Sequence, residues 1–167
     1  MKIRRDAYID IIHAKGHSNV RATHRTTFEV TREDYLTPRG DCIIAVSADK
    51  ALRDLDPGLR MGIKRGWPVV VIVSTGDLWD YSIGWGDPRL ELSDSTRIVV
   101  RRSTYISPNT LMIRASKAAA DLDRRLVDRL RRGDDVYILI STSPDLDELL
   151  RLTLFHDSRD PFIFFHY

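Results

Sequence analysis

VVVIVS, residues Val69–Ser74, begins with five consecutive β-branched apolar side chains, so both of its faces are apolar. Valine and isoleucine favour strands, and a strand without a polar face is typical of the middle of a sheet, where both sides are covered. We therefore expect a central strand here. Residues 24–31 instead alternate, with Thr26, Phe28 and Val30 on one side, which predicts a strand with one buried face.

The same patterns predict the other elements. Ala7–Ala14 is expected to be a strand with Ile9, Ile11 and His13 on one face. Further strands are predicted at Cys42–Val46, Trp79–Ile83, Thr96–Arg102, Leu111–Ile113, Val136–Ile140 and Phe162–His166. Helices are predicted at Ala48–Leu55, where Asp56, Pro57 and Gly58 end the helix, at Ala115–Leu130, and from Ser143-Pro144 to about Leu154.

These elements favour an α+β fold, built on a largely antiparallel, sandwich-like sheet with two or three helices. The alternative is an α/β fold, because strands and helices alternate in the last third of the chain. We expect a single domain over residues 1–167, without an internal repeat, since 167 residues match one ordinary domain.

Composition restricts the class of protein. With 43% hydrophobic and 30% charged residues, the chain is an ordinary globular sequence, and its apolar runs are too short to cross a membrane. Cys42 is the single cysteine and cannot form an internal disulfide, which predicts a reducing, cytoplasmic location. The net charge of +2 is too balanced to indicate nucleic-acid binding by itself.

Four stretches resemble an archaeal family of uncharacterised proteins, domain-of-unknown-function family 371. They are GHSNVRATHRTTFEVT (residues 16–31), LTPRGDCIIAVSADKA (36–51), GWGDPRLELSD (84–94) and RASKAAADLDRRLV (114–127). The resemblance covers about residues 7–140, and the predicted C-terminal helix and strand at 143–167 lie outside it. It implies an archaeal cytoplasmic protein with a mainly-β, sandwich-like domain, and it implies no particular activity.

Function must therefore be read from the residues. Ser47 is a good N-cap for the helix predicted at Ala48–Leu55, and a helix N-terminus after a buried strand favours anions. We expect a small anion, such as a phosphate, at this point. The predicted ligand-binding residues are Arg25, Thr26, Arg39, Ser47, Asp49 and Lys50. His24, with His17 and Asp41, is the predicted acid/base group of a possible enzyme, because histidine titrates near neutral pH.

Less specific interpretations stay open. His13 could instead be a core residue beside Ile9 and Ile11, and His24 a residue at the sheet rim. The loose spacing of His13, His17 and His24 does not predict a metal site. The alternative function is RNA or other nucleic-acid binding by arginines and the loop around Trp85, though only weakly. The C-terminal strand, with Phe162 and Phe164, could pair within the sheet or join two copies of the chain. The sequence identifies no cofactor.

Overall fold

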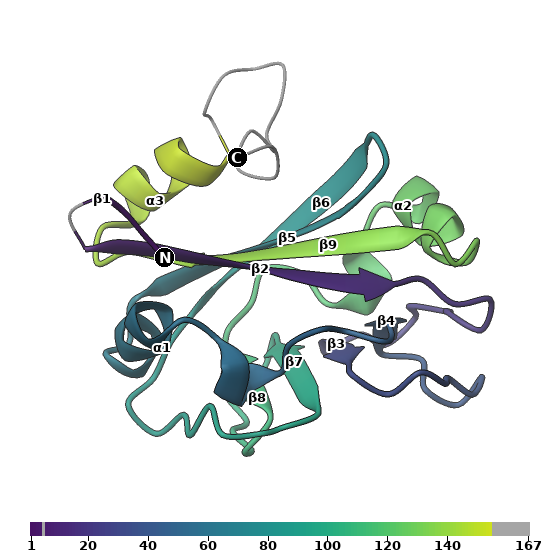
Figure 1. Ribbon diagram of the computed structural model, residues 1–167. Coiled ribbons are helices and arrows are strands. Elements are labelled where there is room, and N and C mark those ends of the chain that lie inside the picture. Colours follow the sequence, from purple (N-terminus) through teal and green to yellow (C-terminus); the bar gives the residue numbers. More distant parts are fainter. Residues whose placement is uncertain (5, 155–167) are drawn as a thin grey trace.

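The computed structural model describes residues 1–4 and 6–154, which form two packed sheets and three α-helices (Figure 1). The five-stranded sheet has the order β1-β2-β9-β5-β6, and the four-stranded sheet has the order β4-β3-β7-β8. Most strand pairs are antiparallel, and the pairs β3–β4 and β7–β8 are parallel. The α+β prediction is confirmed.

The elements follow each other in a fixed order. The strands are β1 (Lys2–Arg4), β2 (Ala7–Lys15), β3 (Thr27–Thr31), β4 (Ile43–Ala45), β5 (Pro68–Thr75), β6 (Leu78–Trp85), β7 (Arg97–Arg101), β8 (Thr110–Met112) and β9 (Asp135–Thr142). The helices are α1 (Pro57–Lys64), α2 (Arg124–Leu130) and α3 (Leu146–Thr153), with 3-10 turns η1 (Leu52–Asp54) and η2 (Ala119–Asp121). The strand predicted at Phe162–His166 lies outside the described residues.

The chain is built from two similar halves, residues 7–75 and 78–142, so the expectation of no internal repeat is wrong. Each half runs through three strands, a 3-10 turn, a helix and a last strand. SADKALRDLDP (residues 47–57) matches RASKAAADLDR (114–124). The backbone repeats as well: Ala22 and Leu92 have φ of 50° and 52°, and Ser47 and Arg114 have φ of 53° and 51°.

The halves are interlocked. The first strand of each half pairs with the last strand of the other, β2 with β9 and β6 with β5. The central pairs, β5–β9 and β3–β7, also join one half to the other. Neither half can therefore complete its sheets alone.

The main core lies between the two sheets. The predicted central strand is confirmed, since every residue of β5 is buried and β5 lies between β9 and β6. Its Val69, Val71 and Val73 face this core, whereas Val70 and Ile72 face a second cluster with α3. Helix α3 covers the face of the five-stranded sheet that points away from the four-stranded sheet (Figure 1).

Two of the predicted helices begin in the wrong place. Residues 48–55 form an extended segment and η1, and α1 begins at Pro57, with Asp56 as its N-cap. Pro57 marks a helix start here, because proline is favoured in the first turn. In the second half the helix predicted at Ala115–Leu130 is shortened to α2, which begins after the N-cap Asp123.

Burial explains the second error. Ala115, Ala118, Ala119 and Leu122 are buried, so their apolar spacing is real, but they line an extended segment and a 3-10 turn. Lys117 holds this segment against β6 through Asp80, at 2.6 Å, and Lys50 makes the equivalent 2.6 Å contact to Asp10. These ion pairs fix both segments in a non-helical path.

Candidate functional site

The segment expected to present a helix N-terminus does not do so. Ser47 is exposed in the left-handed region, at φ 53°, and no helix begins after it, so the predicted capping role of Ser47 is wrong. Asp49 accepts a hydrogen bond from the backbone N–H of His13 (3.0 Å). Lys50 is bonded to Asp10 and to the carbonyl of Ile11. Both side chains attach this segment to β2.

His17 and His24 act as turn caps. In each imidazole Nδ1 accepts the backbone N–H two residues further on, at 3.0 Å and 3.2 Å. The equivalent residues of the second half are Asp87 and Asp94, whose Oδ1 atoms accept the equivalent N–H at 2.8 Å. The two histidines therefore perform a structural task that aspartate performs in the other half.

The remaining predicted residues lie around one end of β3. The carbonyl of Asp41 accepts the backbone N–H of His24 at 3.3 Å, so these two predicted catalytic residues are neighbours. Arg25, Thr26 and Arg39 are exposed. His17 lies against the end of α2, where its backbone N–H donates to the carbonyl of Leu130 at 2.9 Å. The predicted set is therefore divided among three places: the end of β3, the end of α2, and the segment beside β2 that contains Ser47, Asp49 and Lys50.

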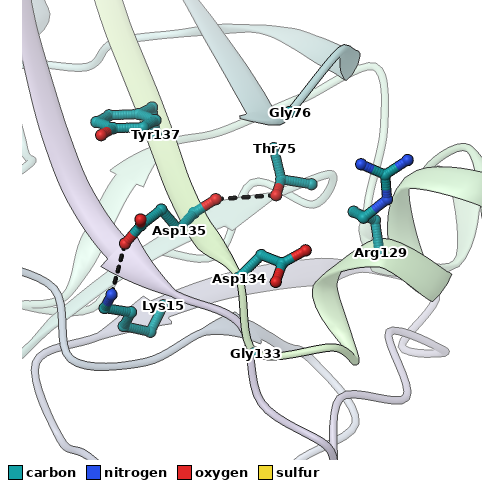
Figure 2. A pocket seen from close by; sticks show the side chains of 8 residues that line it. All are labelled: Lys15, Thr75, Gly76, Arg129, Gly133, Asp134, Asp135 and Tyr137. Carbon is teal, nitrogen blue, oxygen red and sulfur yellow. Dashed lines mark hydrogen bonds and ion pairs between the residues drawn. The ribbon is translucent and has the colours of Figure 1, made fainter.

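A separate cavity of about 510 Å³ opens where β2, β5 and β9 meet the end of α2. This volume is within the range of small-molecule sites. Its lining residues are Lys15, Thr75, Gly76, Arg129, Gly133, Asp134, Asp135 and Tyr137. Figure 2 shows Lys15 with Asp135 on one side, Arg129 on the other, and Asp134 between them.

Asp135 organises one side of the cavity. Its Oδ1 receives Lys15 Nζ at 2.6 Å and His13 Nε2 at 2.8 Å, and the His13 ring stacks on Tyr137 with centroids 5.1 Å apart. Hydrogen bonds from Lys15 and His13 lower the pKa of Asp135, and the bond to Asp135 raises the pKa of Lys15. Asp135 is thus ionised at neutral pH, and Thr75 Oγ1 fixes its backbone carbonyl at 2.9 Å.

Arg129 supplies the cation on the other side. A Cβ on Gly76 would lie 2.8 Å from Arg129 Nη1, so a glycine at the β5–β6 turn leaves room for the guanidinium. The ion pair of Arg129 is with Asp77, at 3.6 Å, and the Asp77 side chain is 85% exposed. Such an exposed pair contributes little and is readily exchanged for a ligand.

The internal repeat provides a comparison for this cluster. The residues concerned are His13, Lys15, Arg129, Asp134, Asp135 and Tyr137, and their counterparts in the other half are Ile83, Trp85, Gly62, Trp67, Pro68 and Val70. The backbone is the same in both places, but titratable and hydrogen-bonding side chains occur around the cavity and apolar or small ones at the equivalent positions. Packing alone therefore does not require the polar set.

Sequence reasoning missed most of this site. The sequence places His13 on one face of a strand and gives it no firm role, and Lys15, Arg129, Asp134, Asp135 and Tyr137 belong to no motif. The signal that could have found them is the alignment of the chain with itself, which places charged residues opposite tryptophan and proline.

A family model described as a domain of unknown function (DUF371) matches residues 12–143. The uncharacterized protein MJ0206 of Methanocaldococcus jannaschii is 43% identical over 130 residues, which cover 78% of this chain and 96% of that protein. Among residues 1–4 and 6–154, no helix is long and apolar enough to cross a membrane. In the same residues, no three His, Cys, Asp or Glu side chains are grouped so that they could hold a metal ion.

Proposed function

The chain belongs to the DUF371 family, and we propose that it binds a small anionic ligand, a phosphate or carboxylate compound, in the cavity between Lys15 and Arg129. The observation that carries this proposal is the contrast between two equivalent places in the fold, each of which takes residues from both halves. The cavity has six polar residues at or beside it, and the equivalent positions elsewhere in the fold have apolar or small residues. We place this activity in the cytoplasm, since the single Cys42 allows no internal disulfide.

Arg129 and Lys15 bind the ligand in different ways. The planar fork of Arg129 suits two oxygens of one phosphate or carboxylate, and Lys15 adds a point charge from the opposite wall. The cavity also contains Asp134 and Asp135, which accept hydrogen bonds from a hydroxyl or amine of the same ligand. This donor and acceptor set favours a compound that carries an acidic group and a neutral or basic polar group.

His13 replaces His24 as the best acid/base candidate. Asp135 holds the imidazole through Nε2, at 2.8 Å, and Tyr137 stacks on the ring, so its orientation is fixed. A carboxylate that orients one nitrogen of an imidazole leaves the other available for proton exchange. His13 does not itself line the cavity, and its connection to a ligand bound there is through Asp135 and Tyr137, which do. His24 lacks this arrangement, because its Nδ1 caps a turn.

A thermal-shift screen of inorganic phosphate, small carboxylates and nucleoside monophosphates tests the proposal. A ligand at about 100 times its Kd stabilises the fold by about 2.7 kcal/mol, which raises Tm by about 5–11 °C for a domain of this size. Arg129→Ala and Lys15→Met should abolish the shift.

The matched control is Arg125→Ala, because Arg125 lies on the same helix, is 78% exposed and contacts Asp123 instead of the cavity. This variant should retain the full shift. If no compound of the screen shifts the wild type, or if all three variants respond alike, the proposed site is refuted.

A further inference from the structure

The two loops that follow β2 and β6 have the same backbone path but opposite charge. Residues 16–26 contain Arg21 and Arg25 and no acidic residue, a formal charge of +2. Residues 86–96 contain Arg89 against three acids, a formal charge of −2. Since both loops place their seventh residue at φ close to 50°, the fold accepts either charge. The basic character of the first loop is thus not a requirement of folding.

Neighbouring segments enlarge the basic loop. Arg21 Nη1 donates to the carbonyl of Pro38 at 3.3 Å, which brings Arg39 alongside. On the other side, the backbone N–H of Arg102 donates to Thr26 at 2.8 Å. Together these residues form what we call the arginine patch: Arg21, Arg25, Arg39, Arg101 and Arg102.

The repeat again shows the contrast. The counterparts of Arg21, Arg25, Arg101 and Arg102 are Glu91, Ser95, Thr31 and Arg32, so a formal charge of +4 in one place corresponds to zero in the other. Arg39 belongs to the loop between β3 and β4, which is three residues longer than the loop between β7 and β8. Within the patch, Arg102 is paired with Asp121 at 3.2 Å. Arg21, Arg25 and Arg39 are exposed, and the half-buried Arg101 is the fourth cation that we count towards phosphate groups.

An exposed aromatic ring adjoins the arginine patch. Tyr105 is 64% exposed, and the guanidinium of Arg101 lies 4.9 Å from its ring centroid. Arg101 is itself held by Thr110 Oγ1 at 2.8 Å and by Ser107 and Asn109, so the stacked pair is pre-ordered. The counterpart of Tyr105 is Tyr35, 61% exposed, which is hydrogen-bonded to Glu33 in an acidic surrounding that raises its pKa.

We infer that the arginine patch with Tyr105 binds single-stranded nucleic acid, with phosphates on the arginines and a base on the exposed tyrosine ring. Aromatic rings beside cations suit single strands, because unpaired bases can stack on them. A duplex offers the same phosphates but no free base. The inference is independent of the cavity, since none of these residues lines it.

Fluorescence anisotropy with labelled oligo-U, oligo-dT and a duplex of equal length tests this inference. Four phosphate contacts on a single strand predict that affinity falls about 50-fold between about 50 and 200 mM salt. Both single strands should bind more tightly than the duplex, and the ratio between oligo-U and oligo-dT separates RNA from DNA as the preferred strand. Lys15→Met and Arg129→Ala should leave this binding unchanged.

The repeat offers matched variants. Arg25→Glu with Arg39→Glu should reduce affinity at least tenfold, whereas Arg53→Glu with Arg89→Glu, the same change of net charge on exposed residues of the other end, should not. Tyr105→Ala should weaken single-strand binding at least fivefold and Tyr35→Ala should not.

Three results would overturn the inference: no binding at about 50 mM salt, equal losses in the two arginine double variants, or equal behaviour of the two tyrosine variants.

Discussion

Replacing Gly16 by alanine should destabilise the protein strongly, because the backbone of α2 occupies the space of the new methyl group. A Cβ at residue 16 would lie 2.0 Å from the carbonyl oxygen of Leu130. Relief requires the chain to move away from α2, which breaks two backbone hydrogen bonds of 2.9 Å, from Gly16 to Asp134 and from His17 to Leu130. Each lost bond costs about 1 kcal/mol, and overpacking adds about 1–3 kcal/mol.

The sum is about 3–5 kcal/mol, which corresponds to a fall in Tm of about 6–20 °C for a domain of this size. Differential scanning calorimetry measures the fall, and urea titration provides the free energy of unfolding. Gly86→Ala should behave in the same way, since its Cβ would lie 2.0 Å from the carbonyl oxygen of Ile63, the counterpart of Leu130.

Gly133→Ala is the control. Gly133 has φ of 79° and no atom within 4 Å of the position of a Cβ, so alanine there costs only the left-handed backbone, about 1–2 kcal/mol. A Gly16→Ala variant that melts with the wild type, or a Gly133→Ala variant that loses more stability than Gly16→Ala, would refute the reasoning.

Three further predictions concern single side chains. The Cys42 thiol should react slowly with a disulfide reagent at pH 8 and rapidly in denaturant, because burial and the nearby Glu29 raise its pKa to about 12; equal rates would contradict this. The pKa of Asp123 is lowered to about 2, chiefly by the hydrogen bond from the Arg125 side chain. The ionised carboxylate therefore stabilises the folded state at a pH above the ordinary pKa of aspartate, and this stabilisation is lost as the pH falls towards 2. The Asp123→Asn variant keeps a capping side chain, and its Tm should fall less than that of the wild type between pH 5 and pH 2. An equal fall would show that the charge of Asp123 does not contribute to the pH dependence of stability. Lys117→Met should lower the free energy of unfolding by about 2–4 kcal/mol in urea titration, and Lys50→Met by a similar amount, because each leaves a largely buried aspartate without its cation; a neutral effect would show that the pairs are dispensable.

The sheets were predictable because their signal is local. A run such as Val69–Ser74 has apolar side chains on both faces, and only a central strand covers both. Helix starts were less predictable, because Asp56-Pro57 is compatible with the end of one helix or the start of the next. The choice depends on Asp10 and Lys50, which lie 40 residues apart in sequence and hold the preceding segment extended.

The candidate site was less accessible to sequence reasoning than the fold. His17 and His24 attract attention as titratable residues, but their Nδ1 atoms are used in turns. Lys15 and Asp135 are 120 residues apart and meet because β2 pairs with the last strand of the other half. Motif spacing cannot reveal a contact that depends on this exchange of strands between halves.

Because the two halves share one backbone path, a comparison of equivalent residues shows which side chains the fold requires and which it merely accepts. Residues such as Asp10 and Asp80 recur with the same contacts in both halves, which identifies them as parts of the fold. Lys15 has no such counterpart, since Trp85 occupies its position. The loop at residues 16–26 is basic, whereas the equivalent loop at residues 86–96 is acidic. The fold alone would permit apolar side chains at these positions, and on this ground we propose a ligand for the cavity and a nucleic acid for the arginine patch.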